Sequence, residues 1–104
     1  MIKDKVAIIT GASSGIGYAT ALALSKAGAK VAIGARRVDR LEELAKKISA
    51  DGGEVFYQKL DVTQRSECEN FAKAVLEKWG SIDILVNNAG LMPLSLFKNL
   101  KVDE

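Results

Sequence analysis

The sequence contains no histidine and a single cysteine, Cys68, among its 104 residues. Without histidine, a catalytic triad built on an imidazole and a zinc site with histidine ligands are both excluded. One cysteine cannot form an internal disulfide, and the sequence shows no cluster of metal-ligating residues beside it. These absences are typical of a protein from a reducing compartment, and we expect a cytoplasmic location.

The sequence also lacks a large excess of charge of either sign and long apolar segments. Fifteen basic and 13 acidic residues give a net charge of +2, which does not favour a surface for nucleic acid or another polyanion. No segment approaches the roughly 20 apolar residues of a membrane span, and Lys3, Asp4 and Lys5 interrupt any signal-like run at the start. We therefore expect a soluble globular protein whose partners include neither nucleic acid nor membrane.

Two hydrophobic periodicities alternate along the chain. Short apolar segments rich in β-branched residues predict strands at 5–10, 29–35, 54–62 and 82–90. Helical spacing of apolar residues predicts a helix over 15–28, a second that ends at the glycines 52–53 and a third that ends at Gly80. Asp39 with Glu42 is typical of a capping box for the second helix, and Thr63 is expected to cap the third.

The resulting order is β-α-β-α-β-α-β with short connections. Such connections keep the strands parallel, make the crossovers right-handed and place helices on both faces of one sheet. The sequence therefore predicts an α/β fold with a doubly wound parallel sheet. With 104 residues and no internal linker, we expect a single domain over 1–104.

A glycine-rich loop follows the first predicted strand, with glycines at 11, 15 and 17 and hydroxyls at Ser13 and Ser14. Gly11 permits a tight turn, and Gly15 would let a pyrophosphate approach the amides that open the next helix. Gly17 would let that helix pack closely on the sheet. The spacing differs from G-x-G-x-x-G, and a P-loop is disfavoured because no Lys-Ser or Lys-Thr follows. Taken alone, the loop is also explained as a simple corner between strand and helix.

Three motifs together resemble one family. "TGASSGIG" at 10–17, "LDVT" at 60–63 and "NNAG" at 87–90 each fall at the tip of a predicted strand. In this order they are similar to the cofactor-binding signatures of the classical short-chain dehydrogenases/reductases. The resemblance covers nearly the whole chain. It implies a Rossmann-type sheet with strand order 3-2-1-4, of which the chain holds the first four strands, so that 1–104 would be a truncated N-terminal part.

The resemblance also implies roles for individual residues. Gly11, Ser13, Ser14, Gly15 and Ile16 would border the pyrophosphate and ribose, with Gly17 completing the motif. Asp61 would accept a hydrogen bond from the adenine amino group, and Val62 would lie against the ring. Asn88, Ala89 and Gly90 would line the floor beneath the ribose and nicotinamide, while Asn87 would steady the sheet. The alternatives are that Asp61 caps the following helix and that Asn87 and Asn88 are ordinary turn residues.

The end of the second predicted strand indicates which cofactor is bound. An NAD site has a carboxylate here that accepts hydrogen bonds from the ribose hydroxyls, but this chain has Ala35 followed by Arg36 and Arg37. A guanidinium can bind a 2′-phosphate bidentately. We therefore expect NADP(H), with Arg36 as the first candidate ligand and Arg37 as the second. Both arginines could instead be solvated residues at the start of a helix, and Ser14 stands where the family often has a supporting basic residue.

The family's Tyr-x-x-x-Lys pair is absent from the chain, because Leu22 lies four residues after Tyr18 and Asp61 four residues after Tyr57. We interpret both tyrosines as packing residues and nominate no catalytic residue and no metal ligand. The resemblance implies the NADP(H)-binding part of an oxidoreductase that transfers hydride between nicotinamide and a small carbonyl or alcohol substrate, and a homo-oligomer. The alternative is a non-catalytic NADP(H)-binding half-domain; a P-loop-like nucleotide phosphatase is disfavoured by the missing lysine motif.

Overall fold

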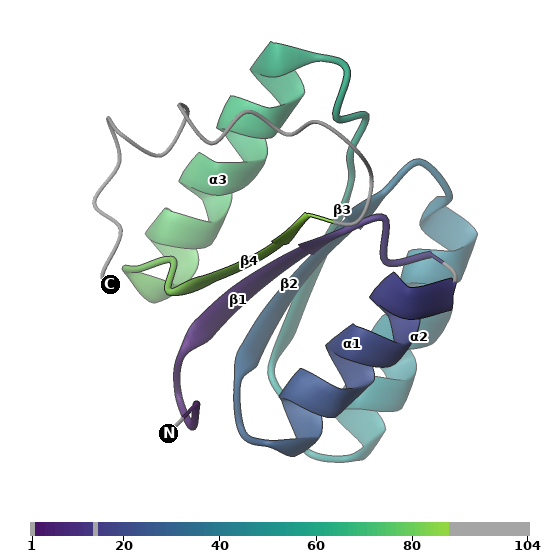
Figure 1. The fold of residues 1–104 in the computed structure, drawn as a ribbon, viewed down its shortest axis with the longest axis vertical. Coiled ribbons are helices and arrows are strands. Elements are labelled where there is room, and N and C mark those ends of the chain that lie inside the picture. Colours follow the sequence, from purple (N-terminus) through teal and green to yellow (C-terminus); the bar gives the residue numbers. More distant parts are fainter. Residues whose placement is uncertain (1, 14, 88–104) are drawn as a thin grey trace.

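The computed structural model describes residues 2–13 and 15–87. Four strands alternate with three helices along this part of the chain (Figure 1). Their bounds are β1 Val6–Thr10, α1 Gly15–Lys26, β2 Lys30–Ala35, α2 Val38–Ala50, β3 Val55–Lys59, α3 Arg65–Trp79 and β4 Ile84–Asn87. The alternation predicted from the hydrophobic periodicity is therefore confirmed.

The strands form one parallel sheet in the order β3-β2-β1-β4, which confirms the predicted order. Thr10 at the end of β1 pairs with Gly34 of β2 on one side and with Asn87 of β4 on the other. Because all strands run in the same direction, their carboxyl ends and the loops that follow them share one edge of the sheet, the upper edge in Figure 1.

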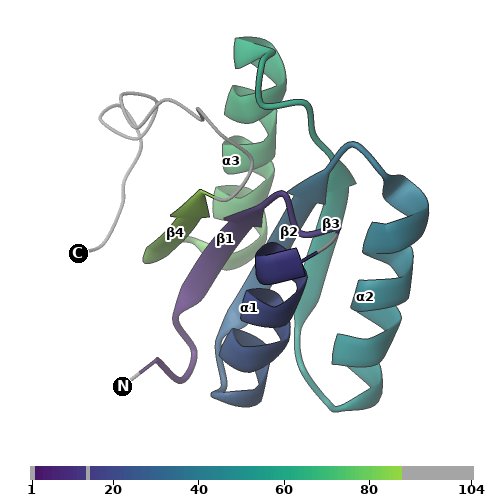
Figure 2. The same ribbon diagram turned by 45° about the vertical axis from the view of Figure 1, so that its right-hand side comes forward.

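Helices cover both faces of the sheet. Figures 1 and 2 show α1 and α2 on one face and α3 on the other. The core is correspondingly divided into two apolar clusters, one beneath α1 and α2 and one beneath α3. Leu41, Leu44 and Ile48 of α2 and Phe71 of α3 are fully buried, and each such side chain contributes about 1.5–3 kcal/mol through removal from water.

The predicted helix caps are wrong. The N-cap of α2 is Arg37, so that Asp39 lies inside the first turn, where its carboxylate accepts a hydrogen bond from Arg37. The N-cap of α3 is Gln64, and the Thr63 hydroxyl donates to Asp61. The two side chains that were expected to cap the helices are thus bound elsewhere, Asp39 to Arg37 and Thr63 to Asp61. Neither observed N-cap residue makes a side-chain hydrogen bond to the helix amides.

The third strand is shorter than predicted, because it ends at Lys59. The Asp61 carboxylate accepts hydrogen bonds from both the backbone amide and the hydroxyl of Thr63, which turns the chain away from the sheet. The fourth strand ends at Asn87 among the described residues, and the remainder of its predicted range, 88–90, lies outside them.

Gly34 lies where β2 is approached by the segment that follows β3. A Cβ at this position would lie 2.8 Å from Cδ2 and 3.0 Å from Cβ of Leu60, and 3.4 Å from Cζ of Phe71. Leu60 and Phe71 are themselves buried. The close approach of α3 and its preceding loop to the sheet therefore requires a residue without a side chain at position 34.

Gly34→Ala is expected to lower the free energy of unfolding by about 1–3 kcal/mol, because the added methyl group forces Leu60 out of its place. Urea unfolding measures this change. In a Leu60→Ala background the same substitution should cost less, since the nearest obstacle, Cδ2 of Leu60, has been removed. An equal loss in both backgrounds would show that the contact with Leu60 is not the cause.

Candidate functional site

The glycine loop connects the end of β1 to the start of α1 at the carboxyl edge of the sheet. The backbone φ angles of Gly11 and Gly15 are 67° and 58°, a left-handed conformation that residues with a Cβ rarely adopt. The amides of Gly11 and Ala12 both donate to the carbonyl of Gly34, at 2.9 and 3.3 Å. These two bonds fix the loop against β2.

The first turn of α1 is suited to an anion. It contains no acidic residue, and a Cβ at Gly15 would meet no described atom within 4 Å. The first amides of a helix lack partners within the helix and carry partial positive charge. Ile16 is 74% exposed beside them, whereas Gly17 is buried against the sheet. Open space and amide donors thus coincide at the start of α1.

A cavity of about 350 Å³ lies beside this loop, between the ends of β1, β2 and β3. It is lined by Gly11, Ser13, Ala35, Arg36, Arg37, Leu60, Val62 and Thr63. Five residues predicted from the sequence therefore gather around one hollow: Gly11, Ser13, Arg36, Arg37 and Val62. Gly15, Ile16 and Gly17 lie at the adjoining start of α1, while Ser14, Asn88, Ala89 and Gly90 lie outside the described residues.

Asp61 adjoins the cavity through its neighbours Leu60 and Val62. Its Oδ1 accepts hydrogen bonds from the Thr63 amide at 3.0 Å and the Thr63 hydroxyl at 2.6 Å, and lies 3.3 Å from Nη2 of Arg36. Its own amide donates to Oε1 of Glu67 at 3.0 Å. The hydrogen bonds from Thr63, and then the Arg36 guanidinium, hold the pKa of the Asp61 carboxyl below its ordinary value of 3.8. The carboxylate is therefore charged and firmly placed.

The two arginines differ in their partners. Arg36 pairs with Asp61 of the neighbouring loop, whereas Arg37 pairs at 3.2 Å with Asp39 in the first turn of its own helix. That hydrogen bond from Arg37 lowers the pKa of the Asp39 carboxyl. Both guanidinium groups are largely exposed. Arg36 thus bridges the β2 and β3 sides of the cavity, and Arg37 stays on the α2 side.

The tips of β1 and β4 are joined by side chains. The Thr10 hydroxyl, which is fully buried, donates to Oδ1 of Asn87 at 3.1 Å. At the other end of the same two strands, the Asp83 carboxylate accepts from the Val6 amide at 2.8 Å. The expected contribution of Asn87 to the sheet therefore has a direct physical basis. The glycine loop begins immediately after the residue that Asn87 holds.

Some contacts of the site were not marked in the sequence. Leu60 and Thr63 belong to the LDVT motif, but no role was expected for Leu60 and only a helix cap for Thr63. Glu67 carried no signal, and it acts through a contact between the loop after β3 and α3 that only the folded chain creates. Cys68 lies below the same turn, fully buried, with its thiol 3.6 Å from the Val62 carbonyl. Burial, followed by the negative charges of nearby carboxylates, raises the pKa of this thiol.

The two tyrosines differ in how far they pack. Tyr18 packs partly against the cluster beneath α1 and α2, with the Lys47 ammonium 5.3 Å from its ring centroid. Tyr57 is 39% exposed on β3, so it packs less than expected.

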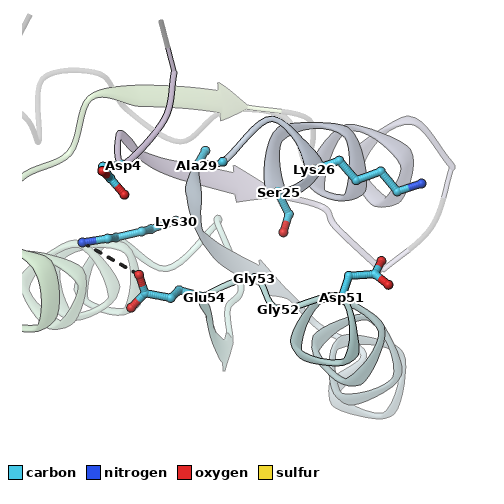
Figure 3. A pocket seen from close by; sticks show the side chains of 10 residues that line it. Asp4, Ser25, Lys26, Ala29, Lys30, Asp51, Gly52, Gly53 and Glu54 are labelled. Carbon is cyan, nitrogen blue, oxygen red and sulfur yellow. Dashed lines mark ion pairs between the residues drawn. The ribbon is translucent and has the colours of Figure 1, made fainter.

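A larger hollow, of about 560 Å³, lies at the opposite edge of the sheet. Figure 3 shows its lining of mixed charges, with an ion pair between Lys30 and Glu54 at 3.9 Å. This hollow is lined by the end of α1 and the turn after α2. The last turn of a helix leaves carbonyl groups without partners, whereas free amides, which bind anions, occur at its first turn. Ligands of open α/β sheets bind at the carboxyl ends of the strands. The smaller cavity is therefore the candidate site.

Comparison with known proteins agrees with this geometry. The family model for short chain dehydrogenases matches residues 5–104. The chain belongs to the short chain dehydrogenase family. An uncharacterized oxidoreductase of Listeria monocytogenes is 48% identical over 103 residues, which are 99% of this chain and 42% of that protein. The chain thus spans less than half the length of this relative in the family.

Solved structures of the family superpose on the chain. An alcohol dehydrogenase from Thermococcus sibiricus complexed with 5-hydroxy-NADP has a TM-score of 0.77 and 50% identity, over 80% of this chain and 36% of that one. A short chain dehydrogenase/reductase from Burkholderia phymatum in complex with NAD has a TM-score of 0.79 and 32% identity, over 81% of this chain and 30% of that one. The family's Rossmann-type fold is therefore confirmed.

Two other features are absent from the part of the chain that the structure describes. None of its helices has both the length and the apolar character needed to span a membrane. Within residues 2–13 and 15–87, no three histidine, cysteine or carboxylate side chains are grouped as a metal site would require.

Thr63→Ala is expected to raise the pKa of the Asp61 carboxyl towards 3.8, because the hydroxyl donor at 2.6 Å is lost. Because the pKa of Asp61 is lower in the folded state than its ordinary value of 3.8, the ionised carboxylate stabilises the folded state above pH 3.8. This stabilisation is lost as the pH falls through the lowered pKa. Carbon-detected NMR of the carboxyl group measures the titration. Thr63→Ser keeps the donor and should leave the pKa unchanged; a shift of equal size in both variants would contradict the assignment.

Proposed function

We propose that the chain forms the NADP(H)-binding part of a short chain dehydrogenase. The observation that carries the proposal is the charge at the end of β2, where Ala35 replaces a ribose-binding carboxylate and two guanidinium groups line the adjoining cavity. A carboxylate at this place would repel a 2′-phosphate, whereas Arg36 can bind it through two parallel hydrogen bonds. The family includes structures bound to 5-hydroxy-NADP and to NAD, so this local difference is what favours NADP(H).

The residues of the site fit such a dinucleotide. The amides at the start of α1 face open space in which a pyrophosphate can lie. Val62 presents an apolar side chain to the cavity for the adenine ring, and the Asp61 carboxylate is a charged acceptor for the adenine amino group. Arg36, with Arg37 as the second candidate, binds the 2′-phosphate. The proposal also assigns Ser13 and Ser14 to the pyrophosphate and Asn88, Ala89 and Gly90 to the ribose and nicotinamide.

When bound, the nicotinamide supplies hydride to a carbonyl carbon or takes it from an alcohol. The 104 residues hold no Tyr-x-x-x-Lys pair, so we assign them binding and orientation of the cofactor and no proton transfer. The proposal also includes a small carbonyl or alcohol substrate and a homo-oligomer, which the likeness to the family supports, and a cytoplasmic location, which the single cysteine supports.

Nicotinamide fluorescence during titration with NADPH and NADH tests the cofactor assignment. We expect the chain to bind NADPH more tightly than NADH. Arg36→Asp should weaken NADPH binding by about 1–3 kcal/mol, the usual loss for a charged hydrogen bond, and should leave NADH binding nearly unchanged.

Arg40→Asp is the matched control. Arg40 is an exposed residue of α2 outside the cavity lining, so its reversal changes the net charge by the same amount without removing a phosphate ligand. Equal affinity of the unsubstituted chain for NADPH and NADH would contradict the proposal, as would equal effects of the two substitutions.

A further inference from the structure

Arg36 and Asp61 form an ion pair at the edge of the candidate site. Nη2 of Arg36 lies 3.3 Å from Oδ1 of Asp61. Arg36 follows β2 and lines the cavity, while Asp61 follows β3 and lies between two residues that line it. The guanidinium group is therefore already bound to an anion, and that anion belongs to the protein.

The two partners are held very differently. Asp61 is fixed by two hydrogen bonds from Thr63 and by the bond from its own amide to Glu67, and its side chain is 27% exposed. The Arg36 side chain is 70% exposed, and it donates its hydrogen bond to Asp61 from an open position at the rim of the cavity. When the pair separates, the guanidinium moves and the carboxylate remains.

We propose that Asp61 competes with the 2′-phosphate of the cofactor for Arg36. In the absence of a ligand the Asp61 carboxylate binds the guanidinium, and the 2′-phosphate displaces it when the cofactor binds. The proposal rests on the proposed function, since it takes Arg36 to be the phosphate ligand. Asp61 then lowers the affinity for a 2′-phosphorylated ligand in two ways. It holds the guanidinium before binding, and its negative charge remains close to the phosphate afterwards.

The chemistry of the two anions sets the size of the effect. A phosphate carries more charge than a carboxylate and offers three acceptor oxygens. It therefore binds the Arg36 guanidinium more strongly than the Asp61 carboxylate does, and displaces it. Exposed ion pairs are weak, so the competition reduces affinity by a small factor and does not prevent binding. A ligand without the 2′-phosphate has nothing to exchange, and its binding leaves the pair in place.

Two small ligands isolate this step. Adenosine 2′,5′-bisphosphate and adenosine 5′-monophosphate differ only in the 2′-phosphate, and calorimetry measures their affinities for the full chain. Asp61→Asn removes the negative charge. Because Asp61 is also the proposed acceptor for the adenine amino group, which both ligands carry, the readout is the ratio of the two affinities. We expect this substitution to raise the preference for the bisphosphate over the monophosphate by about two- to fivefold, the range of a weak exposed ion pair.

Two control variants define the cause. Asp51→Asn removes the same charge from an exposed residue at the opposite edge of the sheet and should leave the ratio of the two affinities unchanged. In an Arg36→Met background, Asp61→Asn should raise the ratio by less than it does in the unsubstituted chain, because the contested guanidinium is gone and only the direct repulsion between the carboxylate and the phosphate remains.

Titration of the carboxyl group gives a second readout in the unsubstituted chain. Binding of the bisphosphate should raise the pKa of Asp61, because the guanidinium that helps to lower it has moved to the phosphate. Binding of the monophosphate should not raise it. This measurement does not depend on how well the variants fold.

The outcomes separate the two proposals. If the chain prefers the bisphosphate but Asp61→Asn leaves the ratio unchanged and the Asp61 pKa does not rise on binding, the competition is overturned and the proposed function stands. If Arg36→Met keeps the full preference for the bisphosphate, or if neither ligand binds, the proposed function fails and the competition fails with it.

Discussion

The candidate site depends on the close approach of three backbone segments around Gly34. Its carbonyl accepts the amides of Gly11 and Ala12 and so fixes the loop after β1. Its missing side chain admits Leu60, whose amide donates to the Ala35 carbonyl at 2.9 Å and brings the segment after β3 against β2. One residue in the middle of the sheet thus positions both walls of the cavity. The glycine loop and the segment after β3 keep a fixed position relative to each other because both are hydrogen-bonded to β2.

Much of this arrangement follows from local patterns. Short connections between apolar segments require parallel strands, and parallel strands bring their carboxyl ends to one edge, so the gathering of Gly11, Arg36 and Val62 could be predicted from the order of the elements alone. The motifs at those ends then indicated the family. The helix caps could not be predicted in the same way, because Asp39 and Thr63 each had a second partner, Arg37 and Asp61, that their spacing did not reveal. Contacts of Leu60 and Glu67 depend on how closely α3 approaches the sheet, which no local pattern records.

The electrostatics of the site are concentrated in side chains that can change without altering the fold. Solved members of the family that share this fold are bound to 5-hydroxy-NADP or to NAD. In the proposed site the choice falls to Arg36 and Arg37 after β2, whose side chains are largely exposed. A carboxylate or a guanidinium can be exchanged there at small cost in stability, because exposed charges contribute little to folding. In the proposed site, cofactor preference and fold therefore depend on largely different residues.

The thiol of Cys68 lies under the turn that carries Asp61 and Val62, without exposed surface, and burial raises its pKa. The thiolate is the nucleophile that attacks an alkylating reagent, and the reagent needs access to the sulfur. Alkylation of Cys68 therefore requires a local opening in which the turn separates from α3. The labelling rate measures how often this opening occurs. A dinucleotide bound over the turn would slow this reaction. Cys68 therefore serves as a natural label for local opening of the turn in the unsubstituted chain.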